Sequence, residues 1–200
     1  MNIEPVTLEG KHVRLEPLSL QAHHEALSKI GLDESIWRWN PAPVGTTDQM
    51  RAYIEEALGV QACGLALPFA TIEKSSGTVV GSTRYGNIDI INRRVEIGWT
   101  WIAPRWQRTI VNTEAKYLML GHAFEKLGCM RVEFKTDSLN ERSRNAILRL
   151  GAKEEGTFRN HMTTSSGRIR HSVFFSIIDS EWPSIKTSLE EKLSRPYAPS

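Results

Sequence analysis

The chain has 200 residues, 40% of them hydrophobic and 24% charged, which fits one globular domain with a core large enough to fold alone. Lysine and arginine number 25 against 23 aspartates and glutamates, and this net charge of +2 argues against a nucleic-acid or membrane-surface partner. The two cysteines, Cys63 and Cys129, are too few for a disulfide framework and lack metal-ligand spacing, so we expect both to be buried in a cytoplasmic protein without a metal.

The first part of the chain predicts a strand followed by two helices. Residues 12–18 alternate charged and apolar side chains, as a half-buried strand does, and Ser19 can cap the helix that follows. Residues 36–45 combine two tryptophans, two prolines and a glycine, which predicts an irregular aromatic loop. A second helix is expected at 47–58. No apolar run approaches the roughly 18 residues of a membrane span, and the N-terminal segment lacks the apolar core of a signal peptide.

An antiparallel hairpin and a further strand come next. Residues 68–74 and 78–88 are rich in β-branched side chains and flank a Ser-Ser-Gly turn. The Asn-Arg-Arg turn at 92–94 leads into a strand at 95–103, which Pro104 ends.

Residues 105–129 read as a loop built to hold phosphates, followed at once by a buried helix at 113–127. The start of a helix collects free N–H groups and the positive end of the helix dipole, which together favour an anionic pyrophosphate. Arg105 and Arg108 add positive charge. The segment therefore predicts a nucleotide-bearing cofactor.

The remaining elements complete a βαβ unit and a hairpin. An alternating strand is expected at 131–137, and Asn140 begins a short amphipathic helix that Gly151 ends. A final hairpin turns at 165–167. A small helix and a loose tail at 195–200 follow.

Four segments together resemble the GCN5-related N-acetyltransferase (GNAT) family, and within it the ribosomal-protein N-terminal acetyltransferases (RimJ/RimL-like). These segments are VRLEPL, VEIGWTWIAP, QRTIVNTEAK and NERSRNAILRLGAKEEGTFR. The resemblance spans about 7–182 and implies a single α+β domain over 1–200, with a tail at 183–200. It implies a strongly bent mixed sheet of about seven strands, flanked by helices, whose fourth and fifth strands splay apart to admit the acetyl-pantetheine arm of acetyl-CoA. The implied activity is N-acetyl transfer, in which a primary amine attacks the thioester directly.

The resemblance also assigns the cofactor contacts. They are Trp99, Trp101, Ile102, Arg105, Gln107, Arg108, Thr109, Ile110, Val111, Asn112, Thr113, Asn140 and Ser143. The backbone N–H groups near 99–101 are expected to polarise the thioester carbonyl. The family's pyrophosphate loop (Q or R, x, x, G, x, then G or A) falls on 107–112, where Ile110 and Asn112 replace the small residues that let phosphate approach the backbone.

Two outcomes are open for this loop. If Ile110 points into the core, the backbone donors survive, Asn112 or Thr113 caps the helix, and the nearby arginines and Gln107 engage phosphate. If the loop changes its path, cofactor affinity falls.

In relatives, the asparagine of an NxxS motif contacts the pantetheine arm, and the serine lies near the sulfur as proton donor. Asn140 and Ser143 match this motif. A thiolate has a pKa of about 8 to 9, so even a weak hydroxyl donor can protonate it. The alternative is a simple helix cap with an ordinary surface hydroxyl.

The attacking amine must lose a proton, and Glu96 is the preferred base because its strand is expected beside the thioester. Alternatively, Glu96 is a structural carboxylate that pairs with Arg84 or Arg94. His161 on the final hairpin is the second choice for this base and is also expected among the residues that bind the acceptor.

The acceptor site is expected in the irregular segments. Trp37, Trp39 and Asn40 could form an aromatic wall, with Arg84 and Tyr85 opposite, able to bind a protein N-terminus or a small-molecule amine. The alternative for the tryptophans is core packing.

Two rival functions remain. One is a catalytically degenerate GNAT-fold module that binds CoA or a partner, suggested by the unusual loop. The other is nucleic-acid binding by the arginines of 131–170, which is weaker because acidic residues are interspersed among them. The sequence is compatible with a homodimer and does not identify the amine.

Overall fold

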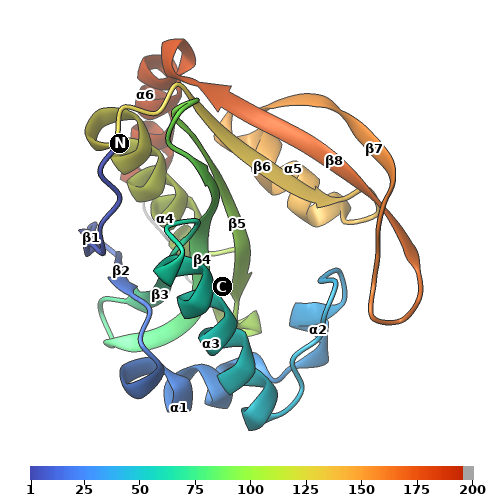
Figure 1. Ribbon diagram of the computed structural model, residues 1–200. Coiled ribbons are helices and arrows are strands. Elements are labelled where there is room, and N and C mark those ends of the chain that lie inside the picture. Colours follow the sequence, from blue (N-terminus) through green and yellow to red (C-terminus); the bar gives the residue numbers. More distant parts are fainter. Residues whose placement is uncertain (196–200) are drawn as a thin grey trace.

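The computed structural model describes residues 1–195 and builds them around one mixed sheet with the strand order β1-β2-β3-β4-β5-β6-β8-β7 (Figure 1). The strands are β1 (Leu8–Glu9), β2 (Val13–Pro17), β3 (Leu67–Glu73), β4 (Thr78–Asp89), β5 (Arg94–Ile102), β6 (Arg131–Asp137), β7 (Lys153–Thr163) and β8 (Ile169–Ile178). The α-helices are α1 (Leu20–Gly31), α2 (Glu34–Trp37), α3 (Thr47–Ala62), α4 (Ile110–Gly121), α5 (Glu141–Leu150) and α6 (Trp182–Ser194). Short helical turns are η1 (Pro104–Trp106), η3 (Asp179–Glu181) and the π-helical η2 (His122–Lys126).

The splay between the central strands is confirmed. β5 and β6 are parallel, and their pairing covers only three positions, the last being Glu96 with Glu133. Beyond this pair β5 stays with β4, while β6 leaves with β8 and β7 as a second wing of the sheet (Figure 1). The sheet has eight strands rather than about seven, because Leu8–Glu9 adds an edge strand too short to show a periodicity.

A β-bulge interrupts β5 just where the splay opens. Ser82 of β4 pairs with Trp101, whereas Arg84 pairs with Gly98, so two steps along β4 match three along β5. Trp99 lies inside the bulge with φ of 49°, a left-handed conformation that is unusual for a bulky residue. The backbone is therefore bent at one defined point of the splayed edge.

Helix starts follow the capping rules, with two shifts from the expected positions. Ser19 caps α1 as predicted. Thr109, and neither Asn112 nor Thr113, caps α4, which therefore begins at Ile110 rather than at 113. Residues 36–45 were expected to be entirely irregular, but their first two residues complete the single turn of α2.

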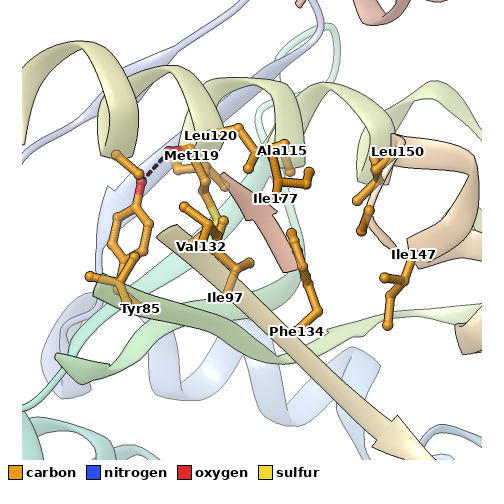
Figure 2. Packing of buried hydrophobic residues seen from close by; sticks show 14 of the residues in the cluster. Tyr85, Ile97, Ala115, Met119, Leu120, Val132, Phe134, Ile147, Leu150 and Ile177 are labelled. Carbon is orange, nitrogen blue, oxygen red and sulfur yellow. Dashed lines mark hydrogen bonds between the residues drawn. The ribbon is translucent and has the colours of Figure 1, made fainter. Parts of the chain in front are cut away.

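Two hydrophobic cores lie on opposite faces of the sheet. One is shared with α4, α5 and α6, and Figure 2 shows Ile97, Val132 and Phe134 of the central strands packed beneath α4. The other is shared with α1, α2 and α3. The described helices do not include one that is long and apolar enough to cross a membrane.

The two wings are linked again at the tip of the β7–β8 hairpin. Ser165 donates its N–H to the Pro41 carbonyl at 2.8 Å, and Arg170 reaches the Trp39 carbonyl. The loop after α2 therefore joins the outer wing. Apart from its first residue, the expected loose tail at 195–200 lies outside the described part of the chain.

Candidate active site

The residues expected to meet pyrophosphate lie between β5 and α4. Arg105 and Arg108 are exposed, and Arg108 has φ of 62°, which turns the chain into the helix. Gln107 instead donates its Nε2 to the Ile102 carbonyl at 2.7 Å, so this side chain is tied to the end of β5. Thr109 then caps the helix by accepting from the N–H of Val111.

The loop keeps a helix start despite its unusual residues. Val111 rather than Ile110 enters the core, and Ile110 is half-buried at the surface. Asn112 Oδ1 is shielded from solvent and has no hydrogen-bond partner among the described residues. Free N–H groups at the first turn of α4, two exposed arginines and an unpaired polar atom fit an anionic ligand with polar groups.

Glu114 follows in the same helix, and its side chain serves a structural purpose. Its carboxylate accepts the backbone N–H groups of Lys11, His12 and Val13 at 2.6 to 2.9 Å. A Cβ at Gly10 would lie 2.7 Å from this carboxyl group, so the chain passes close to it. The N-terminal segment is thus anchored to the helix that carries the loop.

Asn140 and Ser143 lie at the start of α5. Asn140 Oδ1 accepts the N–H of Ser143 at 3.1 Å, which is the helix-cap role. Ser143 is half-buried, and none of the hydrogen bonds of residues 1–195 uses its hydroxyl. The cap therefore leaves Ser143 Oγ available for another partner.

Glu96 is the last residue of β5 that pairs with β6 before the two strands separate, and only 4% of its surface is exposed. Its Oε2 accepts from Asn87 Nδ2 at 2.7 Å and from Lys135 Nζ at 3.1 Å. The expected alternative partners were wrong, because Arg84 pairs with Glu56, and Arg94 pairs with carboxylates of β4 and β6. Among the described residues, no hydrogen bond engages Glu96 Oε1.

A cationic and aromatic layer continues from Glu96 toward α3. The Trp99 ring is exposed and lies 4.7 Å from the Arg84 guanidinium and 5.7 Å from Lys135 Nζ. Arg84 is itself buried, stacks on Tyr53 and donates both terminal nitrogens to Glu56. Its guanidinium is thus already paired with a carboxylate.

Three aromatic residues of the predicted site belong to the core instead. Tyr85 is fully buried under α4, where its hydroxyl donates to the Met119 carbonyl (Figure 2). Trp37 and Trp101 pack against each other between the sheet and the helices α1 to α3, and Trp37 Nε1 donates to the Gly31 carbonyl. Trp37 and Tyr85 therefore cannot form an open acceptor wall, and the Trp101 ring is not open to a cofactor.

Trp39 and Asn40 remain half-buried in the loop after α2. The Trp39 ring lies 5.7 Å from the Arg168 guanidinium of the β7–β8 hairpin, and Asn40 donates to the Ile36 carbonyl. This part of the predicted wall therefore faces the outer wing of the sheet.

His161 lies on that outer wing. Its Nδ1 is 2.9 Å from Ser172 Oγ, and Phe158 packs against the ring. Burial lowers the pKa of His161 from its usual value, and the charges of Lys135 and Arg170 act in the same direction. An open pocket of about 730 Å³ includes His161 and Phe158 in its lining.

Sequence reasoning missed the two side chains that hold Glu96. Asn87 has φ of 47°, and asparagine tolerates this left-handed region well, so the Gly-Asn pair within a strand was an available signal. Lys135 gave no signal, because it reaches Glu96 from 39 residues away. The cysteine expectation was half right, since Cys129 is buried and Cys63 is exposed.

Comparisons with known proteins agree with this geometry. A family model described as "Acetyltransferase (GNAT) domain" matches residues 12–153. A GCN5-related N-acetyltransferase from Brucella melitensis has a crystal structure with a TM-score of 0.89 at 34% identity, covering 96% of this chain and 87% of that one. Mycobacterium smegmatis RimJ in complex with CoA-disulfide shares the fold, with a TM-score of 0.82 at 23% identity over 94% and 95% of the two chains.

Among sequence relatives, "Putative ribosomal N-acetyltransferase YdaF" of Bacillus subtilis is 33% identical over 106 residues, which are 53% of this chain and 57% of that protein. The match thus spans little more than half of that relative. The "Uncharacterized N-acetyltransferase p20" of Bacillus licheniformis is 25% identical over 88% of this chain and 98% of its own length. The family match, the splayed sheet and the capped loop together show that this chain belongs to the GNAT acetyltransferase family.

Proposed function

We propose that this chain is an acetyl-CoA-dependent N-acetyltransferase that acts on a primary amine. The observation that carries the proposal is the opening of the sheet after Glu96, with the bulge on one side and the capped start of α4 at the end of β5. Beyond Glu96, none of the strands of residues 1–195 pairs with the β6-facing edge of β5, so this edge can receive an extended ligand. The start of α4 offers N–H groups to an anion at the end of that ligand.

The residues of the loop have different proposed roles in binding the cofactor. The N–H groups of the first turn of α4, with Arg105 and Arg108, would hold the pyrophosphate, while Gln107 keeps the loop attached to β5. Bound there, acetyl-CoA supplies an activated acetyl thioester. The β5 backbone at 99–101 would donate an N–H to the thioester carbonyl and so stabilise the charge that grows on its oxygen.

Glu96 is the proposed proton acceptor for the amine. A protein N-terminus has a pKa of about 8 and a lysine about 10.4, so the amine must be deprotonated before it attacks. Asn87 and Lys135 hold Oε2 and leave Oε1 free to take the proton, directly or through a water. Their donors also fix the direction of the carboxylate.

Ser143 is the proposed proton donor to the leaving thiolate. Its hydroxyl has no competing partner among residues 1–195, and Asn140 fixes the start of the helix that carries it. Because a thiol has a pKa of about 8.5, a hydroxyl or an ordered water is a sufficient donor.

The acceptor is either a protein N-terminus or a small-molecule amine. The name of the relative YdaF, a putative ribosomal N-acetyltransferase, supports a ribosomal-protein N-terminus. The Trp99 platform, the cations around it and Trp39 would line the approach of the acceptor. Because Arg84 is already paired with Glu56, its contribution would be to hold Trp99 rather than to bind a carboxylate.

Two measurements on the wild-type chain test this function. Acetyl-CoA should raise the melting temperature, because a ligand that binds only the folded state stabilises it. A panel of ribosomal N-terminal peptides, amino sugars and polyamines should then reveal release of free CoA with at least one amine. The absence of a thermal shift at millimolar acetyl-CoA would refute the proposal, and a shift without turnover across the panel would favour the non-catalytic binding module.

A further inference from the structure

Lys116 is a buried lysine of α4 that lies beneath the bulge of β5. Only 5% of its surface is exposed, and its Nζ donates to Thr83 Oγ1 at 2.9 Å and to Thr100 Oγ1 at 2.5 Å. None of the salt bridges among residues 1–195 involves Lys116. Burying an ammonium group without a carboxylate beside it costs folding free energy, and this cost favours the neutral amine.

The number of acceptors around Lys116 matches a neutral amine. A neutral amine has two N–H groups, and the described residues offer it two hydroxyl oxygens, one from Thr83 and one from Thr100. An ammonium would carry a third N–H. Burial lowers the pKa of Lys116 from its usual 10.5 to about 7, which agrees with this count.

The two threonines connect Lys116 to the bulge. Their hydroxyls lie 2.8 Å apart, and both reach the Gly98 carbonyl, Thr83 at 3.4 Å and Thr100 at 3.3 Å. Thr83 belongs to β4 and Thr100 to β5, so the amine joins the two strands where their register shifts. Met119 adds a sulfur contact to Thr83 from the same helix.

The opposite face of the bulge belongs to the candidate site. Glu96 is close enough to Gly98 that a Cβ there would lie 3.0 Å from the carboxylate, and the Trp99 ring covers Gly86 so closely that a Cβ would lie 2.3 Å from it. A small rotation of the backbone at 98–100 would therefore move the N–H groups of β5 relative to the Glu96 carboxylate and would also move the Trp99 ring.

We propose that Lys116 is a positioning residue that holds the bulge at 98–100 through Thr83 and Thr100, and thereby sets the direction of the β5 N–H groups that meet the thioester carbonyl. The inference rests on the proposed function for its catalytic consequence. The hydrogen bonds of Lys116 to the two threonines do not depend on that function. It also explains why a polar amine, rather than an apolar side chain, occupies this position beneath the sheet.

Lys116→Met is the first test, because methionine has a similar length and replaces a buried polar group with an apolar one at little cost. The variant should fold with a melting temperature no lower than that of the wild type. Its kcat should fall about 10- to 100-fold, the effect of a slight misplacement of reacting groups, with KM for acetyl-CoA changed less than about threefold. Lys126→Met, at an exposed lysine of η2, is the matched control.

A pair of substitutions at Thr100 separates positioning from simple packing. Thr100→Val removes the hydroxyl and should reproduce the loss of kcat, whereas Thr100→Ser keeps the hydroxyl and should restore most of it. The double variant with Lys116→Met and Thr100→Val should be no worse than either single variant, because both break one contact. Equal defects in Thr100→Ser and Thr100→Val, or additive losses in the double variant, would overturn the proposal.

Hydrogen exchange gives a readout that needs no turnover. Peptides covering 97–102 should exchange faster in Lys116→Met, while those covering β3 should not change. If the wild-type chain acetylates no amine, the proposed function fails, and the exchange result alone decides whether Lys116 holds the bulge. Unchanged exchange at 97–102, or a kcat within twofold of wild type in an active enzyme, would overturn it.

Discussion

Two lysines approach β5 from opposite faces, and their surroundings differ. Lys135 comes from β6, is partly exposed and pairs with the carboxylate of Glu96. Lys116 comes from α4, is buried, and among residues 1–195 donates hydrogen bonds to the hydroxyls of Thr83 and Thr100 alone. The first face offers a carboxylate that can accept a proton, and the second offers an uncharged set of hydrogen bonds. In the proposed function, one side of β5 therefore carries the proton acceptor, and the other side carries the hydrogen bonds that hold the backbone in place.

The largest expected effect is on the chemical face. Glu96→Gln keeps the shape of the side chain and removes the proton acceptor, so kcat should fall about 10²- to 10⁴-fold, the usual contribution of a general base. Steady-state kinetics with the best amine of the panel would measure this loss. Glu133→Gln, on the neighbouring strand and paired with Arg131, is the control and should keep kcat within about threefold. Comparable losses in both variants would assign Glu96 a structural role.

On the second face, Lys116 should make stability depend on pH. Because its pKa is 10.5 when unfolded and about 7 when folded, between these values the unfolded chain binds a proton that the folded chain does not. The free energy of unfolding should therefore rise with pH across this window, and this gain is lost as pH falls toward 7.

Urea unfolding of wild type and Lys116→Met at pH 7, 8 and 9 would measure this effect. As pH rises, the free energy of unfolding of the wild type should increase relative to that of the variant by up to about 1.4 kcal/mol per pH unit. A constant difference between the two chains would mean that Lys116 has the same charge folded and unfolded.

A smaller effect is expected at Gly86, which the Trp99 ring covers. Gly86→Ala places a Cβ 2.3 Å from the Trp99 ring, so the ring must leave its present position beside Arg84. Overpacking of this kind costs about 1 to 3 kcal/mol, and thermal unfolding should show it. The acceptor KM should rise while the affinity for acetyl-CoA stays unchanged. A normal acceptor KM would remove the Trp99 platform from the proposed acceptor site.

The smallest effect concerns the two cysteines, neither of which has a role in the proposed site. Cys63 is exposed, whereas burial raises the pKa of the Cys129 thiol to about 11. A disulfide reagent should therefore titrate one thiol in the native chain and two after unfolding. Modification of Cys63 should leave activity unchanged. Rapid reaction of both thiols in the native state would show that the packing around Cys129 opens readily.

The sequence predicted elements that have strong local signals. Ser19, the alternation at 131–137 and the glycine that ends α5 each act through neighbouring residues. The bulge was not predicted, because a tryptophan with positive φ has no local signature.

The side-chain errors have a common physical cause. Arg84 and Tyr85 are consecutive in β4, so they must point to opposite faces, and only one could line the acceptor site. The bulge shifts the alternation of β5 by one residue, and Trp101 beyond it lies in the core shared with α1 to α3. The partners of Glu96 depend on tertiary contacts that a single strand does not encode.

The anchoring of Glu114 has a consequence for how the chain folds. Its carboxylate binds the N–H groups of residues 11–13, about a hundred positions away in sequence. The entropy of closing such a long loop must be lost before the contact forms, and contacts of this separation slow folding. The start of the helix that follows the candidate phosphate loop is thus tied to residues 11–13 only after this long loop has closed. We expect changes near Gly10 to slow maturation of the cofactor site, even though they lie far from it in sequence.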